Sequence, residues 1–580
     1  MRVAVSTDLT HPTYGRPPLK EVLVAGAFAA LASVLYVVLA ARHHAVGVAR
    51  SDDWVYYRAA FKFARDGSFS ADPWAFTMLV GHLVLARPVI AVFGTSIAAL
   101  QLMVAVLAAL ALTATYLLAR SYLSRGHAAL AVGSLALGPV YGTLSVSYMT
   151  DIPAFALETL VLLAGLQALR TNRLSFPWFV VSLLIGVAAF SIREYAIAAP
   201  AAVSIVALRR VGANDRLQMR RVAVSVLFGL LVAAGMYVWR HSLPGVSHVA
   251  RPLQSPLITM AYVCSAAFTI SLFAFPMFFL ISVKAAARAL RDSSRGALAV
   301  ASVIVLAWVL LSANGAVLVG NYLTAFGSYP ETLPGDPPVV VPALLWHVLT
   351  ILSLLSLLSL AGVGLTLRHT PRSTETTHAR STAHSAGLQL SWMFSLLMCG
   401  ELAVVKLATP GVISDRYLLP IVPFVIAVAL HRAAESGLLV QRFRLLAILS
   451  LAVMAVLGIA VVDASATFDG AKWQLATSVQ RSGFASETID GGYEWFGYHQ
   501  QGTIIDFELN APARNWWNRL FEKRDICVET RFGGTPPKDG VIADNRRVVG
   551  RLAVRTLFGV NYDLVAVRTS EPCLVTRATL

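Results

Sequence analysis

Charged residues are scarce in this chain. They make up 13% of its 580 residues, whereas hydrophobic residues make up 57%. Soluble proteins carry about a quarter charged residues, so the composition excludes a water-soluble multidomain protein. The high apolar content and the lack of short repeats also exclude a disordered or fibrous chain. The sequence has no CxxC pair or zinc-binding spacing, and no Walker loop, GxSxG or HExxH motif. A polytopic membrane protein remains.

Long apolar runs are what the chain does have. A membrane span needs roughly 20 mostly apolar residues. The run 77–94 is not counted as a span, because Gly81, His82, Arg87 and Pro88 interrupt it. We therefore predict a mainly α, polytopic helical membrane protein with about 13 transmembrane helices, at 22–42, 97–119, 127–144, 152–169, 177–192, 195–208, 222–239, 257–282, 297–319, 343–367, 388–408, 417–431 and 445–463.

The net charge of +16 is explained by the loops between these spans. If the N-terminus is cytoplasmic, the inner segments hold 22 of the 47 Lys and Arg residues, whereas the outer connections between the later spans hold few. This bias is the positive-inside pattern of a multi-pass protein of the inner (cytoplasmic) membrane. The charge therefore does not indicate nucleic acid as a partner. Counting 77–94 as a span would place the basic loops outside, so we interpret it as helices at the outer membrane surface.

The same topology predicts three parts. They are a cytoplasmic N-terminus (1–21), a transmembrane domain (22–463) with a long first outer loop (43–96), and an extracytoplasmic C-terminal domain (464–580). The first span, 22–42, lacks a signal-peptide cleavage site. The tail is polar and predicts a small α/β domain, with helical spacing over 471–481 and a strand at 562–568. The polar, low-complexity segment 368–387 predicts a flexible cytoplasmic connection.

The four cysteines fall into two groups. Cys264 and Cys399 lie inside predicted spans, where cysteine is usually a small apolar filler. Cys527 and Cys573 lie in the outer tail, where the compartment permits a disulfide between them. A disulfide and two free thiols remain equally open for that pair.

Acidic residues at the membrane boundary are the main functional candidates, because ionisable groups there are costly and rare. Asp52 and Asp53 follow the first span and precede Trp54 and Tyr56. Two adjacent carboxylates in a partly apolar setting do not both ionise freely, so we expect one to have a raised pKa and to serve as a base. The alternative is an ordinary helix cap formed by Ser51 or Asp52.

Two further motifs fall on the same outer face. Asp151, with Pro153 two residues later, opens the span 152–169, and a helix cap is again the alternative. Asp415, Arg416 and Tyr417 open the span 417–431, where the arginine side chain can bind a phosphate through forked hydrogen bonds or simply pair with the aspartate. Arg193-Glu194, in a tight outer turn, is a further phosphate contact or a local ion pair.

These motifs, in this order, resemble the GT-C superfamily of membrane glycosyltransferases, most closely the family 39 type of protein O-mannosyltransferases and the lipid A aminoarabinose transferase. Asp52-Asp53 with Tyr56 resembles that family's acidic pair, here Asp-Asp rather than Asp-Glu. Residues 149–153 resemble its second acidic motif, and Asp415-Arg416-Tyr417 with Pro420 resembles its late Arg-Tyr motif. The tail segment 489–495 resembles that of uncharacterised bacterial members.

The resemblance implies inverting transfer of a hexosyl or pentosyl group from a polyprenyl-phosphate donor to a lipid, glycan or protein acceptor at the outer membrane face. Membrane lipid is the other expected partner. Asp52, Asp53 and Asp151 are the catalytic candidates, with Asp52 as base. Arg416 and Arg193 would stabilise the leaving phosphate. Trp54, Tyr56, His82 and Tyr417 would line the substrate pocket. The need for a metal cofactor stays open: the carboxylates could hold Mg²⁺ or Mn²⁺, but no His or Cys cluster supports a metal.

A transporter or lipid flippase is the main alternative, since polytopic topology suits it too. Transporters place charges near the midplane of broken helices and often show inverted repeats. Here the notable mid-span charges are Glu158, Glu401 and Lys406, without an obvious repeat partner. A scaffold anchored by its spans is a third alternative, but thirteen spans exceed what an anchor needs.

Overall fold

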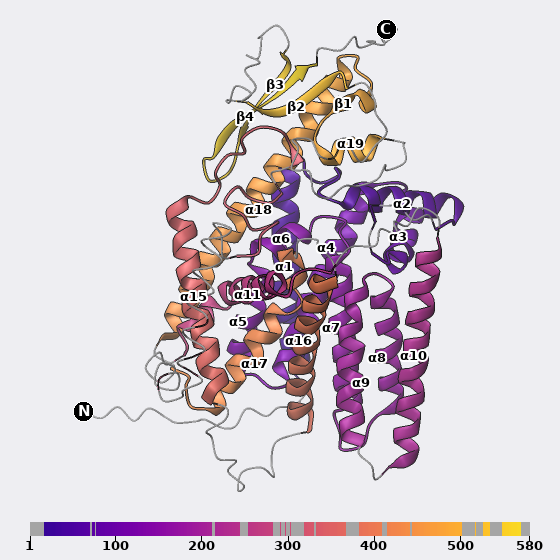
Figure 1. Ribbon diagram of the computed structural model, residues 1–580, viewed down its shortest axis with the longest axis vertical. Coiled ribbons are helices and arrows are strands. Elements are labelled where there is room, and N and C mark those ends of the chain that lie inside the picture. The colour runs from indigo at the N-terminus through magenta and orange to yellow at the C-terminus, as the bar shows by residue number, and fades with distance from the viewer. Residues whose placement is uncertain are drawn as a thin grey trace, which may run out of the picture.

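The computed structural model describes residues 17–69, 72, 74–75, 77–211, 215–243, 253–281, 291, 296, 298, 302, 305, 318–329, 332–366, 382–408, 414–440, 443–500, 517, 526–533 and 548–569. The protein is mainly helical, as predicted, and a small sheet lies beyond one end of the helix bundle (Figure 1).

The helices of the membrane part run in chain order from α1 to one very long helix, α18. Their bounds are α1 (Leu19–Arg42), α2 (Asp53–Asp66), α3 (Val80–Phe93), α4 (Ile97–Arg120), α5 (Arg125–Ala136), α6 (Pro139–Leu144), α7 (Asp151–Ala168), α8 (Phe176–Phe190), the 3₁₀ helix η1 (Glu194–Ile197), α9 (Ala198–Val211), α10 (Arg216–Ser242), α11 (Pro256–Phe273), α12 (Phe275–Phe278), α15 (Ala343–Thr366), α16 (Thr382–Ala408), the 3₁₀ helix η4 (Asp415–Leu418), α17 (Val422–Glu435) and α18 (Arg444–Arg481).

Eight helices of the described residues are long and apolar enough to cross a membrane: α1, α4, α7, α10, α11, α15, α16 and α18. Several of them expose large apolar side chains. On α10, for example, Leu227, Phe228 and Leu231 are each more than half exposed. Such surface is costly in water and is what lipid tails require. The protein is therefore a multi-pass membrane protein.

Prolines divide two of the predicted spans. The run 127–144 separates into α5 and α6, and α6 begins with Pro139. The run 257–282 ends α11 at Phe273, and α12 follows with Pro276 in its first turn. Proline has no backbone N–H to donate, so it is tolerated at a helix start and disrupts a helix interior. The predicted span 297–319 lies mostly outside the described residues.

The long first loop, 43–96, carries two helices, α2 and α3. They pack against each other and lie at the end of the bundle nearest the sheet (Figure 1). With 14 residues, α3 is shorter than a membrane span requires. This agrees with leaving the run 77–94 out of the predicted spans.

The last long helix continues past the predicted end of its span at residue 463. α18 has 38 residues and reaches Arg481, so it includes the helix predicted over 471–481. Its apolar part lies in the bundle, and its C-terminal part contacts the sheet (Figure 1). Phe468 of α18 stacks on Phe532 of the sheet with ring centroids 5.4 Å apart.

The sheet has the strand order β1-β2-β4-β3. β1 and β2 are parallel, whereas β4 is antiparallel to both β2 and β3. The strand predicted at 562–568 is β4. The elements of this region are the 3₁₀ helix η6 (Ser486–Thr488), β1 (Ile489–Asp490), α19 (Tyr493–His499), β2 (Val528–Gly533), β3 (Val548–Arg555) and β4 (Asn561–Arg568).

The structure describes three of the four cysteines. Cys264 and Cys399 are free thiols. Cys527, directly before β2, is disulfide-bonded. Its expected partner, Cys573, lies outside the described residues, as does almost all of the predicted connection 368–387.

Candidate active site

Asp52 lies at the start of α2 with its carboxylate shared by donors from three distant parts of the chain. Tyr493 Oη and Trp74 Nε1 donate to Oδ1 over 2.9 and 3.0 Å, and Arg416 Nη1 lies 3.3 Å from Oδ2. Asp52 is the N-cap residue of α2, but its side chain makes no capping hydrogen bond. The side chain keeps 23% of its surface exposed, so an incoming hydroxyl can reach it.

Asp53 has a different environment from its neighbour. It is fully buried and accepts hydrogen bonds from the backbone N–H groups of Arg50 (2.5 Å) and Tyr148 (3.1 Å). Burial raises the pKa of Asp53 well above its usual value, against the effect of these bonds and of the Arg50 guanidinium. Asp53 joins the first loop to the segment before α7, and it combines a raised pKa with a buried position that an incoming hydroxyl cannot reach.

Asp151 is the first residue of α7 and pairs with Arg193. Nη2 of Arg193 donates to Oδ2 over 3.1 Å, and Nε donates to the hydroxyl of Thr150 over 2.7 Å. The N-cap residue of α7 is Thr150, whose side chain makes no capping hydrogen bond. Oδ1 of Asp151 is buried without a hydrogen-bond partner among the described residues. The pair is almost fully buried, with side-chain exposures of 5% for Arg193 and 1% for Asp151. Oδ1 is therefore an acceptor available to a ligand.

Asp415 and Arg416 do not pair with each other in η4. Asp415 instead accepts hydrogen bonds from the backbone N–H groups of residues 321–323, the shortest 2.7 Å from Leu323. Burial raises the pKa of Asp415, and these bonds oppose the rise. Because Asp415 is bound to these N–H groups, the Arg416 guanidinium donates hydrogen bonds to Asp52 and to the hydroxyls of Tyr322 and Tyr417 instead. Arg416 Nε is buried without a hydrogen-bond partner in the part of the chain that the structure describes.

Tyr417 lies beside two guanidinium groups. Its ring centroid is 5.2 Å from Cζ of Arg416 and 5.3 Å from Cζ of Arg193. Burial raises the pKa of Tyr417, but the two arginines outweigh burial and the pKa falls below its usual value. Two arginines beside one phenol make a region of positive potential suited to a phosphate.

The other predicted pocket residues occupy different positions. Tyr56 is buried within electrostatic range of Asp52, Asp151 and both arginines. His82 is fully buried; it stacks on Tyr148 with centroids 4.1 Å apart and meets the Tyr56 ring edge-on. Trp54 is also fully buried, and α19 packs so closely on it that a Cβ at Gly497 would lie 2.4 Å from its ring. His82 and Trp54 thus pack beneath the site as buried side chains.

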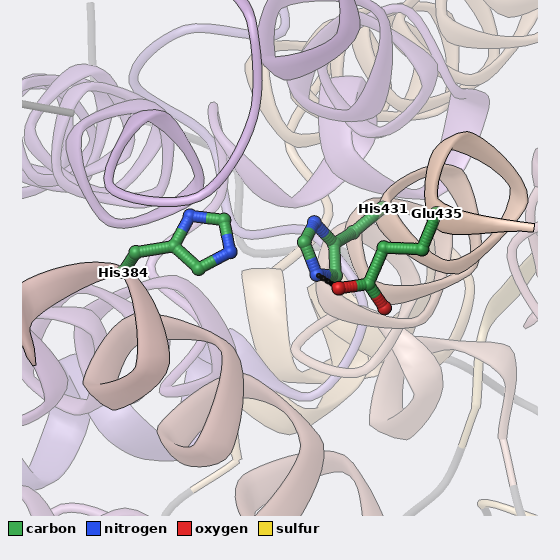
Figure 2. Close-up of side chains that lie close together, drawn as sticks. All are labelled: His384, His431 and Glu435. Carbon is green, nitrogen blue, oxygen red and sulfur yellow. Dashed lines mark ion pairs between the residues drawn. The ribbon is translucent and has the colours of Figure 1, made fainter. Parts of the chain in front are cut away.

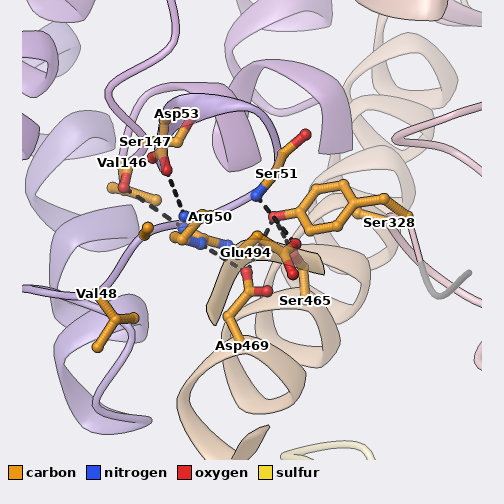
Figure 3. Close-up of polar contacts among 12 residues, drawn as sticks. Val48, Arg50, Ser51, Asp53, Val146, Ser147, Ser328, Ser465, Asp469 and Glu494 are labelled. Atoms are coloured by element: carbon orange, nitrogen blue, oxygen red, sulfur yellow. Dashed lines mark hydrogen bonds and ion pairs between the residues drawn. The ribbon is translucent and has the colours of Figure 1, made fainter. Parts of the chain in front are cut away.

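A buried charged network, which the sequence did not reveal, holds this loop to α18. Arg50 is fully buried; its Nε donates to Asp469 over 2.7 Å, and its Nη2 donates to Ser465 (Figure 3). Ser51 has a φ of +56°, which is a costly backbone conformation for serine. Its backbone N–H donates a hydrogen bond to Oε1 of Glu494 over 3.1 Å. The loop conformation that presents Asp52 is therefore fixed from α18 and α19.

Sequence reasoning also missed three aromatic donors: Trp74, Tyr322 and Tyr493. For Tyr493 a signal existed, since the segment 489–495 was already singled out in the tail. Trp74 and Tyr322 lie in polar connections without periodicity. Their roles depend on which segments fold together.

As a unit, the cluster can accept a proton and bind an anion. Asp52 offers a solvent-accessible carboxylate, whereas Arg416, Arg193 and Tyr417 offer cationic and hydroxyl donors beside it. Asp52 and Asp151 are carboxylates of the kind that bind divalent cations, but each is paired with an arginine in this structure. The fold and the cluster together define a multi-pass helical membrane protein with an acid–arginine site at one end of its bundle.

Comparison with known proteins confirms the resemblance to GT-C membrane glycosyltransferases for part of the chain. The family model "Dolichyl-phosphate-mannose-protein mannosyltransferase" matches residues 80–239, which include His82, Asp151 and Arg193. Two solved structures of ArnT from Cupriavidus metallidurans are similar. The apo structure has a TM-score of 0.38 at 14% identity, covering 94% of this chain and 98% of ArnT. The structure bound to undecaprenyl phosphate has a TM-score of 0.38 at 13% identity, covering 93% and 98%. No curated protein matches the chain.

Proposed function

We propose that this protein is a glycosyltransferase of the cytoplasmic membrane. It moves a hexosyl or pentosyl group from a polyprenyl-phosphate donor to a hydroxyl acceptor at the outer face, where the C-terminal domain also lies. The observation that carries the proposal is the Asp52–Arg416 ion pair near the Asp151–Arg193 pair, with Tyr417 in contact with both guanidinium groups. The family match over residues 80–239 supports the reaction class.

In the proposed reaction Asp52 is the general base. Its carboxylate takes the proton of the acceptor hydroxyl, the acceptor oxygen attacks the anomeric carbon, and the bond from that carbon to the phosphate oxygen breaks with inversion. A positioned base typically contributes 10²- to 10⁴-fold to the rate. Arg416 then exchanges its contact with Asp52 for the leaving phosphate, on which negative charge develops.

Arg193, Tyr417 and Asp151 complete the proposed site. The two arginines bind the phosphate beside Tyr417, and Oδ1 of Asp151 accepts a hydrogen bond from a sugar hydroxyl. Asp53 positions the loop and takes no proton in the reaction, because both of its oxygens accept backbone hydrogen bonds.

The proposal is tested with the purified full-length protein in detergent. Polyprenyl-phosphate donors carrying radiolabelled hexoses or pentoses are mixed with an envelope extract as the acceptor source. We expect free polyprenyl phosphate and a labelled envelope product in equal amounts. A transporter or flippase would leave the donor intact in detergent and would move it across vesicles instead. Intact donor throughout the panel would contradict the proposal.

A further inference from the structure

A second cluster of ligand-type side chains lies between α16 and α17, away from the acid–arginine site. It consists of His384 near the start of α16 and of His431 and Glu435 in the last turns of α17 (Figure 2). One ligand atom from each residue lies within 4.8 Å of those of the other two. This cluster was not visible in the sequence, because 46 residues separate the two histidines.

The geometry of the cluster is close to that of a metal site. His431 and Glu435 are one helical turn apart, so both side chains project from one face of α17. Nε2 of His431 lies 3.2 Å from Oε1 of Glu435. Two ligand atoms on a tetrahedral Zn²⁺, each about 2.1 Å from the ion, stand roughly 3.4 Å apart. These two ligands are thus already correctly spaced, and the His384 ring faces them across the helix interface (Figure 2).

The surroundings support a built site. Both histidines are only 4% exposed, whereas the Glu435 side chain keeps 21% of its surface exposed and leaves an access path for an ion. Arg432 binds the other carboxylate oxygen of Glu435 over 3.1 Å, which fixes Oε1 toward His431. The Tyr122 ring meets His431 edge-on and holds the imidazole in place.

We infer that His384, His431 and Glu435 form a Zn²⁺ site that joins α16 to α17. Two imidazoles and one carboxylate suit zinc and related first-row metals rather than Mg²⁺ or Ca²⁺, and water would complete the coordination. The ion would lie between Nε2 of His431 and Oε1 of Glu435, which already face each other. α17 begins four residues after η4, which carries Arg416, so the ion would fix the far end of the helix that follows the phosphate contact.

The inference is tested by metal counting on the purified full-length protein. The protein is stripped with EDTA, desalted, loaded with Zn²⁺ and passed over a gel-filtration column before atomic emission analysis. We expect the His384→Gln/His431→Gln double variant to bind one Zn²⁺ per chain fewer than the native protein. His347, an exposed histidine on α15, supplies the matched control, and His347→Gln should bind as the native protein does. Equal Zn²⁺ content in the native protein and the double variant would overturn the inference.

A second variant keeps the test valid if the double variant fails to fold. Glu435→Gln changes one partly exposed oxygen ligand and leaves both buried histidines in place. We expect its Zn²⁺ affinity, measured by competition with a chromophoric chelator, to fall at least tenfold. In the Co²⁺-loaded protein, the visible absorption bands of a low-symmetry site should shift in this variant. Unchanged affinity and unchanged bands would exclude Glu435 as a ligand and overturn the three-residue site.

Discussion

The contact between Tyr493 and Asp52 provides a sharp test, because it joins the C-terminal region to the proposed base. Tyr493 is 2% exposed, and its hydroxyl donates to Asp52 over 2.9 Å. A hydrogen bond to a charged group is worth about 1.5–3 kcal/mol. Since about 1.4 kcal/mol corresponds to a factor of ten, Tyr493→Phe should lower kcat/KM by roughly 10- to 100-fold if the full bond energy orients the base in the transition state.

The assay is initial-rate transfer by the purified protein, with donor concentration varied. Tyr498→Phe is the matched control, since Tyr498 lies on the same short helix, α19, and its ring contacts Trp473 and His499 rather than Asp52. Both variants should elute from gel filtration as the native protein does. A Tyr493→Phe variant within twofold of native kcat/KM would refute the argument that the tail orients Asp52.

Three further predictions concern Arg416, Tyr417 and the buried Asp469. Arg416→Lys should raise the donor KM about tenfold, because lysine cannot form the forked contact; an unchanged KM in the transfer assay would make Arg416 structural. Arg416 and Arg193 lower the pKa of Tyr417, so its phenol ionises at a lower pH than usual. The ionised phenol repels the donor phosphate, and donor affinity should therefore fall as the pH rises through this pKa. Tyr417→Phe should remove that alkaline loss in a pH profile of KM, and an identical profile would refute the link. Asp469→Asn leaves the buried charge of Arg50 unpaired and should destabilise the fold by about 3–5 kcal/mol, seen as a lower Tm in detergent, whereas an unchanged Tm would contradict a structural role.

Local patterns predicted the apolar spans and the motifs of the site, because each depends on a short stretch of chain. Asp52, Asp151 and Arg416 were chosen as scarce charges at span ends, and in the structure each contacts another charged member of the cluster. The role of Asp53 was beyond such reasoning. It depends on the backbone N–H of Tyr148, which lies 95 residues away in sequence.

The C-terminal end of α18 also depends on contacts between residues far apart in sequence, which local patterns do not predict. The sequence turns polar at Asp463, which predicts the end of a span there. In the fold, Asp463 pairs with His43 over 2.7 Å, and Asp469 pairs with Arg50. These partners come from the first loop, more than 400 residues earlier. With its carboxylates satisfied by tertiary contacts, the helix continues to Arg481.

The most direct test of the central claim is the rate of polyprenyl phosphate release by Asp52→Asn. Asparagine keeps the shape of the side chain but cannot take the acceptor proton, so we predict a loss of 10²- to 10⁴-fold with an unchanged gel-filtration profile. Asp66→Asn, at the exposed end of the same helix α2, should retain native activity. Release by Asp52→Asn within twofold of the native rate would contradict the assignment of Asp52 as the base.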